Sequence, residues 1–136
     1  MTNAPGDETT ILVVDDDDTV REFIKVALEG FGYRVMAAAD GASGLAIYRE
    51  HYLEIDLVLL DMMMPDLDGA ALFRALRQWD PQVKCLMVSG YAEAAEVEAL
   101  RAEGLLGLIK KPFTLTTLAK RVEEALVGEL CNTHDM

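Results

Sequence analysis

The chain has 136 residues, and 51% of them are hydrophobic, which suits one compact domain with a full core. A formal net charge of -12 argues against direct nucleic-acid binding, because the phosphate groups would be repelled. No apolar run is long enough to cross a bilayer, and the N-terminus carries no signal-peptide pattern. We therefore expect a cytoplasmic protein that has no membrane partner.

Five apolar runs bounded by turn residues alternate with helical patterns along the chain. The expected strands are Thr10–Val14, Tyr33–Ala38, Asp56–Leu60, Val83–Val88 and Leu105–Ile109. The expected helices are a segment capped by Asp17 or Asp18 and stopped by Gly30 and Gly32, then residues 42–51, 69–79, 93–103 and 114–127. This alternation predicts a parallel sheet with helices on both faces. We expect Trp79 to pack its helix against that sheet.

Polar side chains follow four of the expected strands at the point where each strand ends. Asp15 and Asp16 follow the first strand, Asp61 the third, Ser89 the fourth and Lys111 the fifth. In a parallel sheet these ends share one edge, which is where open α/β sheets bind their ligands. Clustered carboxylates repel one another unless a hard cation lies between them, and ligands that are all oxygen favour Mg²⁺. With a lysine and a hydroxyl beside the ion, Asp61 could attack a phosphoryl group in line and form an acyl phosphate.

Four motifs then carry a resemblance to a known family. They are Val13-Val14-Asp15-Asp16, Asp61 with Met64-Pro65 and Asp68-Gly69, Ser89-Gly90, and Lys111-Pro112-Phe113. In this order and spacing the chain resembles a response-regulator receiver domain of two-component signalling, over about residues 10–127. The resemblance implies a flavodoxin-like, three-layer α/β sandwich with a five-stranded parallel sheet of order 2-1-3-4-5 and five helices. Residues 1–9 are polar and include Pro5 and Gly6, so we expect a disordered tail there, followed by a receiver domain at 10–127 and a C-terminal tail at 128–136.

The resemblance assigns a role to each acidic strand-end residue. Asp61 would be the phosphoacceptor in a reaction that depends on Mg²⁺. Asp16, Asp61 and the main-chain carbonyl of Met63 would bind the ion directly, and Asp15 would hold it mainly through water. A domain of this kind signals by conformational change and is not an enzyme in the usual sense, because it catalyses only its own phosphorylation and dephosphorylation.

The resemblance also implies the phosphoryl-binding residues and the partners. Ser89 and Lys111 would bind the phosphoryl oxygens, and the Lys111-Pro112 peptide would be cis. The donor would be a sensor histidine kinase or a histidine phosphotransfer protein, and the signal would pass to a downstream protein. The Ser89-Gly90-Tyr91 run is similar to receivers attached to hybrid kinases. The stretch after Gly128 is short for an output module, so we expect either a single-domain regulator or part of a longer chain, as a monomer or a phosphorylation-dependent dimer.

Three further positions bear on how such a domain would signal and how fast its phosphoryl group would hydrolyse. Leu108 occupies the place of a rotating aromatic residue three positions before Lys111, which puts the usual coupling to the face of the fourth helix, fifth strand and fifth helix in question. Met63 and Tyr91 occupy the two positions that tune hydrolysis, and neither is an acid or an amide that would orient water. We therefore expect a phosphoryl group that hydrolyses slowly.

Two other functions fit part of the sequence. A phosphohydrolase similar to the haloacid-dehalogenase superfamily would use Asp15 as nucleophile and Asp17 as acid/base, but it would leave Asp61 without a role. A receiver-like interaction module that needs no phosphate fits Leu108, but not the retained cluster of like charges. Taken singly, Asp15 and Asp16 would be part of a helix-capping acidic run, Asp61 a turn residue, Ser89 a loop hydroxyl and Lys111 a surface lysine. Their convergence on one sheet edge favours the receiver interpretation.

Overall fold

The computed structural model describes residues 9–65, 67–90 and 94–127. The expected tails at 1–9 and 128–136 lie outside these residues except for Thr9, so the predicted domain limits stay predictions. Tyr91 also lies outside them. Within the described ranges, no helix is both long enough and apolar enough to cross a membrane.

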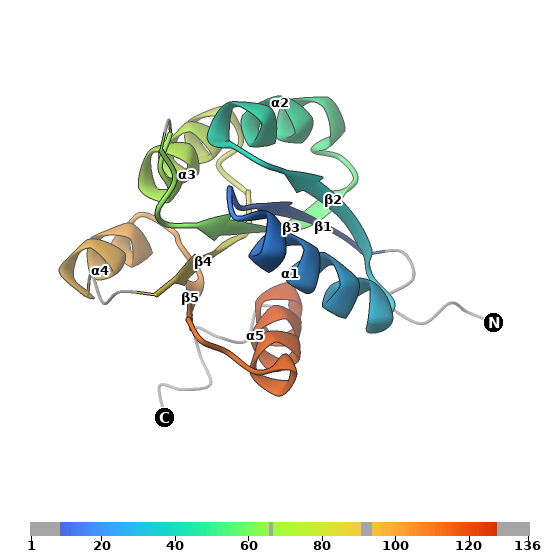
Figure 1. The fold of residues 1–136 in the computed structure, drawn as a ribbon. Coiled ribbons are helices and arrows are strands. Elements are labelled where there is room, and N and C mark those ends of the chain that lie inside the picture. The colour runs from blue at the N-terminus through green and yellow to red at the C-terminus, as the bar shows by residue number, and fades with distance from the viewer. Residues whose placement is uncertain (1–8, 66, 91–93, 128–136) are drawn as a thin grey trace.

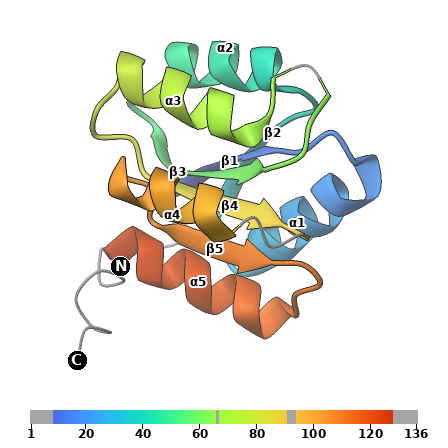
Figure 2. The same ribbon diagram turned by 90° about the vertical axis from the view of Figure 1, so that its left-hand side faces the viewer.

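A single parallel sheet with the strand order β2-β1-β3-β4-β5 forms the centre of the molecule. Its strands are β1 (Thr10–Val14), β2 (Arg34–Ala38), β3 (Ile55–Asp61), β4 (Cys85–Ser89) and β5 (Gly107–Lys110). The helices are α1 (Asp18–Gly30), α2 (Gly41–His51), α3 (Gly69–Trp79), α4 (Ala94–Ala102) and α5 (Leu115–Val127). Figures 1 and 2 show α1 and α5 on one face of the sheet and α2, α3 and α4 on the other. The predicted flavodoxin-like fold is confirmed.

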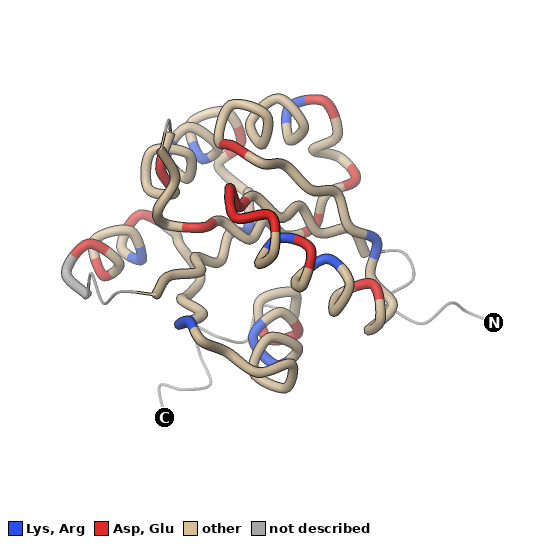
Figure 3. The backbone as a smooth tube through the Cα atoms, viewed as in Figure 1, with Lys and Arg blue, Asp and Glu red and all other residues tan. Residues whose placement is uncertain are grey.

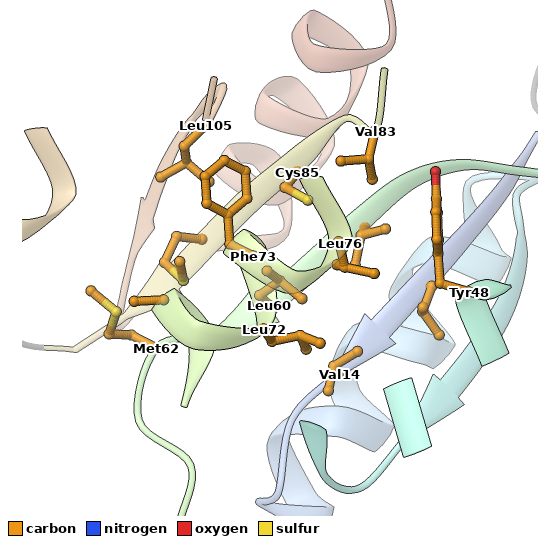
Figure 4. Packing of buried hydrophobic residues seen from close by; sticks show 14 of the residues in the cluster. Val14, Tyr48, Leu60, Met62, Leu72, Phe73, Leu76, Val83, Cys85 and Leu105 are labelled. Carbon is orange, nitrogen blue, oxygen red and sulfur yellow. The ribbon is translucent and has the colours of Figure 1, made fainter. Parts of the chain in front are cut away.

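The core has two layers, one on each face of the sheet. Successive strand residues point to opposite faces, so Leu12 and Val14 pack toward α2 and α3 while Ile11 and Val13 pack toward α1 and α5. Figure 4 shows the first layer, in which Phe73 from α3 lies among strand side chains. Helices cover both faces of β1, and all five of its residues are therefore buried, with four consecutive apolar residues after Thr10.

Short polar side chains set the starts of the helices. Asp17 caps α1 by accepting hydrogen bonds from the backbone N–H groups of Thr19 and Val20, which confirms the capping prediction. Asp40 and Asp68 cap α2 and α3 in the same way. Each cap satisfies N–H groups that have no partner within their own helix.

Trp79 does not pack α3 against the sheet, and that expectation is wrong. Its ring lies 4.6 Å from the ring of Tyr52 and 6.4 Å from that of Tyr48, both edge-on, and Trp79 is 41% exposed. The sheet-facing stripe of α3 is already filled by other residues, including Phe73 and Leu76. Trp79 therefore joins α3 to the end of α2.

The strand register brings the carboxyl ends of the strands to one edge. Val14 at the end of β1 is level with Leu60, and Asp61 at the end of β3 is level with Val88. Ser89 at the end of β4 is level with Lys110. The residues that follow β1, β3, β4 and β5 are therefore neighbours in space, although about a hundred residues separate the first from the last in sequence.

Candidate functional site

Asp61 is the last residue of β3 and is 5% exposed. The chain turns just after it, and the first residue of α3, Gly69, packs directly on this turn. A Cβ atom at Gly69 would lie 2.5 Å from the main-chain oxygen of Asp61 and 2.8 Å from the Cα of Met62. The Gly69 N–H also donates to the Met62 carbonyl at 3.0 Å. The glycine is required here because the main chain of α3 passes too close for a side chain.

Two more carboxylates lie beside Asp61. One oxygen each from Asp15, Asp16 and Asp61 can be chosen so that all three lie within 4.8 Å of one another. Asp15 is buried, and its backbone N–H donates to the Ala38 carbonyl at 3.1 Å, while Asp16 is exposed. Figure 3 shows this acidic run next to the end of β3. The structure thus brings the three predicted acidic residues together.

The buried carboxylates of the cluster are harder to ionise than ordinary aspartates. Burial, followed by the negative charge of Asp15, raises the pKa of Asp61 to about 6, although Lys111 and the backbone N–H of Met63 act in the opposite direction. Burial also raises the pKa of Asp15, partly offset by a hydrogen bond from the Asp17 backbone N–H. Ionising both carboxylates therefore costs free energy, and a bound cation would remove that cost.

The donor set fits a hard divalent cation. Within the described part of the chain, Oδ2 of Asp15 is buried and has no hydrogen-bond partner. A buried carboxylate oxygen in this state costs free energy unless another group satisfies it. All three candidate ligands are carboxylates, without histidine or cysteine, and this favours Mg²⁺ over zinc. The residues present therefore fit the metal that the sequence predicts.

Lys111 and Ser89 lie at the same sheet edge, on the side of β4 and β5. The Lys111 Nζ lies 3.4 Å from Oδ1 of Asp61, at the long end of an ion-pair hydrogen bond. The Lys111 backbone N–H donates to the Ser89 carbonyl at 2.8 Å, and Ser89 is buried. The Lys111-Pro112 peptide is cis, as expected. This arrangement places an ammonium group beside the buried Asp61 carboxylate.

The remaining predicted positions lie around this centre. Met63 is 57% exposed and lies two residues beyond Asp61. Leu108 is half-buried on β5 and packs against the core layer under α4. The expected roles of Leu108 in coupling and of Met63 in hydrolysis stay predictions.

Sequence reasoning missed two features beside the site. Arg21 reaches back from α1 and donates to the main-chain carbonyl of Asp15 at 2.8 Å. The i,i+3 spacing of Asp18 and Arg21 was a signal for the ion pair between them, but not for the carbonyl contact. Phe23 is exposed, and its ring lies 6.0 Å from that of Phe113. Both rings line a groove together with Lys111, so an apolar surface borders the site. No motif in the sequence marks that surface.

Comparisons with known proteins agree with this geometry. The family model for the response regulator receiver domain matches residues 11–123. The chain is 44% identical over 117 residues to the sensor kinase CckA of Brucella abortus, a match that covers 86% of this chain and 12% of CckA. It is 33% identical over 118 residues to the response regulator receiver protein CpdR of the same organism, covering 87% of this chain and 97% of CpdR.

Solved structures give the same result. A receiver domain protein from Clostridium thermocellum superposes with a TM-score of 0.84 at 30% identity, covering 89% of this chain and 96% of that one. The chain spans 12% of CckA and 50% of two related transcriptional regulatory proteins, so it corresponds to one part of those relatives. Its fold, its acidic strand ends and the family match over most of its length together mean that this chain belongs to the response regulator receiver domain family of two-component signalling.

Proposed function

We propose that this chain accepts a phosphoryl group on Asp61 in a reaction that depends on Mg²⁺. Phosphoryl acceptance is typical of the family, and the proposal concerns the residue and the ion in this chain. One observation carries it: the buried Asp61 carboxylate lies at the sheet edge with an ammonium group 3.4 Å away and two further carboxylates within 4.8 Å. A carboxylate in these surroundings can act as a nucleophile toward a phosphoryl group that the neighbouring groups bind.

The transfer is an in-line displacement at phosphorus. An oxygen of ionised Asp61 forms the new P–O bond while the bond from phosphorus to the donor atom breaks, and the donor leaves with the electron pair. Because the pKa of Asp61 is about 6, the carboxylate is largely ionised at neutral pH. The Lys111 ammonium and the Ser89 hydroxyl bind the phosphoryl oxygens. Lys111 would exchange part of its contact with Asp61 for the incoming group.

Asp15, Asp16, Asp61 and the main-chain carbonyl of Met63 would hold Mg²⁺. The unsatisfied Oδ2 of Asp15 supports this assignment. When bound, the ion would neutralise charge on the phosphoryl oxygens and relieve the repulsion within the cluster.

The donor would be a sensor histidine kinase, including a hybrid one, or a histidine phosphotransfer protein, and the signal would pass to a downstream protein. An apolar groove of about 670 Å³ supports a protein donor. It is lined by Phe23, Lys111 and Phe113 among others, and it opens beside the residue that contacts Asp61. A protein that delivers its phosphoryl group to Asp61 would contact this groove.

Intact-mass measurement tests the assignment. We expect the wild type to gain one phosphoryl group from acetyl phosphate with Mg²⁺, and to gain none with EDTA. Asp61→Asn should gain none, whereas Asp17→Asn, a matched control in the same acidic run that keeps a capping side chain, should react like the wild type.

Two results would contradict the proposal. An adduct that persists in Asp61→Asn would move the nucleophile elsewhere, with Asp15 as the next candidate. No adduct on the wild type, with acetyl phosphate and also with a phosphorylated histidine phosphotransfer protein, would favour a module that works without phosphate.

A further inference from the structure

Arg21 lies in α1, one turn from its start, and folds back over the loop that joins β1 to α1. Its Nη1 donates to the main-chain oxygen of Asp15 at 2.8 Å, and its Nη2 donates to Oδ1 of Asp18 at 2.5 Å. The Arg21 side chain is 21% exposed and that of Asp18 is 86% exposed. The ion pair with Asp18 alone would be an ordinary surface pair of small value. The contact with the Asp15 carbonyl is what sets this arginine apart.

That carbonyl belongs to the peptide that joins Asp15 to Asp16. A peptide unit is planar, so a hydrogen bond to its oxygen restrains the direction in which both flanking side chains leave the main chain. Both of these side chains belong to the acidic cluster. A side-chain carboxylate already holds one N–H group of this loop, since the Asp17 N–H donates to Oδ1 of Asp15 at 2.9 Å. Arg21 holds its carbonyl side.

We propose that Arg21 is a positioning residue that holds the β1–α1 loop in the arrangement that binds Mg²⁺. This inference rests on the proposed function of the cluster. Guanidinium suits the task because it is planar and offers two N–H groups to two acceptors in a fixed geometry. A lysine would supply the same charge without the fork.

A positioning role for Arg21 and a purely electrostatic role predict opposite changes in Mg²⁺ affinity when its charge is removed. Removing a cation that lies beside an acidic cluster should strengthen the binding of Mg²⁺ if only Coulomb forces act. Losing a group that orients the ligands should weaken it, and the loss of such partners typically costs about 10- to 100-fold in metal affinity. The direction of the change therefore separates the two effects.

The test is calorimetric titration of Mg²⁺ into the unphosphorylated full chain. Lys25 supplies a matched control, because it lies one turn further along the same face of α1 and pairs with Glu29, one turn further again from the loop, at 3.1 Å. We expect Arg21→Met to bind Mg²⁺ about 10-fold more weakly than the wild type. Arg21→Lys should also bind more weakly, by a smaller factor, and Lys25→Met should bind like the wild type.

A kinetic measurement gives an independent readout. In phosphorylation by acetyl phosphate, the Mg²⁺ concentration that gives half the maximal rate should rise in Arg21→Met. The factor of this rise should exceed the factor by which the maximal rate falls. Unchanged or tighter binding in Arg21→Met overturns the inference, and so does equal weakening in Lys25→Met. If Arg21→Met melts far below the wild type in EDTA, then Arg21→Lys decides by the same criterion. Absence of Mg²⁺ binding by the wild type would overturn the proposed function together with this inference, whereas equal affinities in wild type and Arg21→Met overturn the inference alone.

Discussion

Replacing Asp61 by Asn should make the metal-free protein more stable at neutral pH. Asp61 is buried, and burial together with the charge of Asp15 raises its pKa from 3.8 to about 6. Between these two pH values the folded state holds a proton that the unfolded state has lost. The free energy of unfolding therefore falls as the pH rises through this window, and it stays lower above it. Asn keeps the shape of the side chain and removes its charge.

The magnitude follows from the difference between the two pKa values. A difference of about 2 units corresponds to about 3 kcal/mol of lost stability at pH values above both. Asp61→Asn should recover most of it. For a domain of this size, such a gain raises the melting temperature by roughly 10 °C. Mg²⁺ should reverse the order, because it stabilises the wild type and leaves the variant largely unaffected.

Thermal unfolding in EDTA, followed by circular dichroism from about pH 7.5 down to about pH 4, measures this effect. The gap between Asp61→Asn and the wild type should be largest at the upper limit and should shrink toward zero at the lower one. Asp40→Asn is a control of opposite sign, because the backbone N–H of Ser43 lowers the pKa of Asp40 and its charge favours the fold. If Asp61→Asn is no more stable than the wild type near pH 7.5, or if the gap does not change with pH, then the buried charge of Asp61 does not destabilise the metal-free fold and the prediction is refuted.

Three further predictions concern other residues. Gly69→Ala should lower the free energy of unfolding in urea by about 1–3 kcal/mol, because its Cβ would lie 2.5 Å from main chain. It should also slow phosphorylation, measured as the gain in intact mass with time. Gly30→Ala is the control, because its Cβ would meet nothing within 4 Å and neither quantity should change. Tyr48→Phe should cost about 2 kcal/mol in the same unfolding assay, because the Tyr48 hydroxyl donates to the Asp80 carboxylate at 2.6 Å; a change near zero would mean that water replaces this bond. Met63→Asn should shorten the half-life of the phosphorylated protein after donor removal, because an amide can orient water where the exposed thioether does not; an unchanged half-life would remove Met63 from the control of hydrolysis.

The sequence predicted the carboxyl ends of the strands better than their amino ends. An acidic residue, a serine or a lysine marks the carboxyl ends, whereas apolar residues continue past the amino ends. Val83 and Leu105 were expected in β4 and β5, and both are buried, but neither belongs to a strand. The Val83 N–H donates to the Asp80 carbonyl, and the Leu105 N–H donates to that of Leu100, so both residues close turns. Burial is the same in a turn and in a strand, and the hydrophobic pattern alone does not separate them.

The same distinction holds at the candidate site. Asp15, Asp16 and Asp61 could be placed together from sequence, because parallel strands end at one edge and these side chains are short. The reach of Arg21 depends on a long side chain that has several rotamers open to it, and only the folded loop selects one. The exposed ring of Phe23 had the helical spacing of a core residue, yet it faces the surface beside Phe113.

The aromatic contact between α3 and the end of α2 has a spectroscopic consequence. Trp79 is the single tryptophan of the chain, and it is held edge-on to Tyr52 and Tyr48. It lies at the far end of α3 from Gly69, which touches the main chain of Asp61, and the helical rise puts about 15 Å between the two ends. Tryptophan emission in this protein therefore reports the melting of the helix pair, and a response to metal or phosphoryl transfer would mean that α3 transmits the event along its whole length.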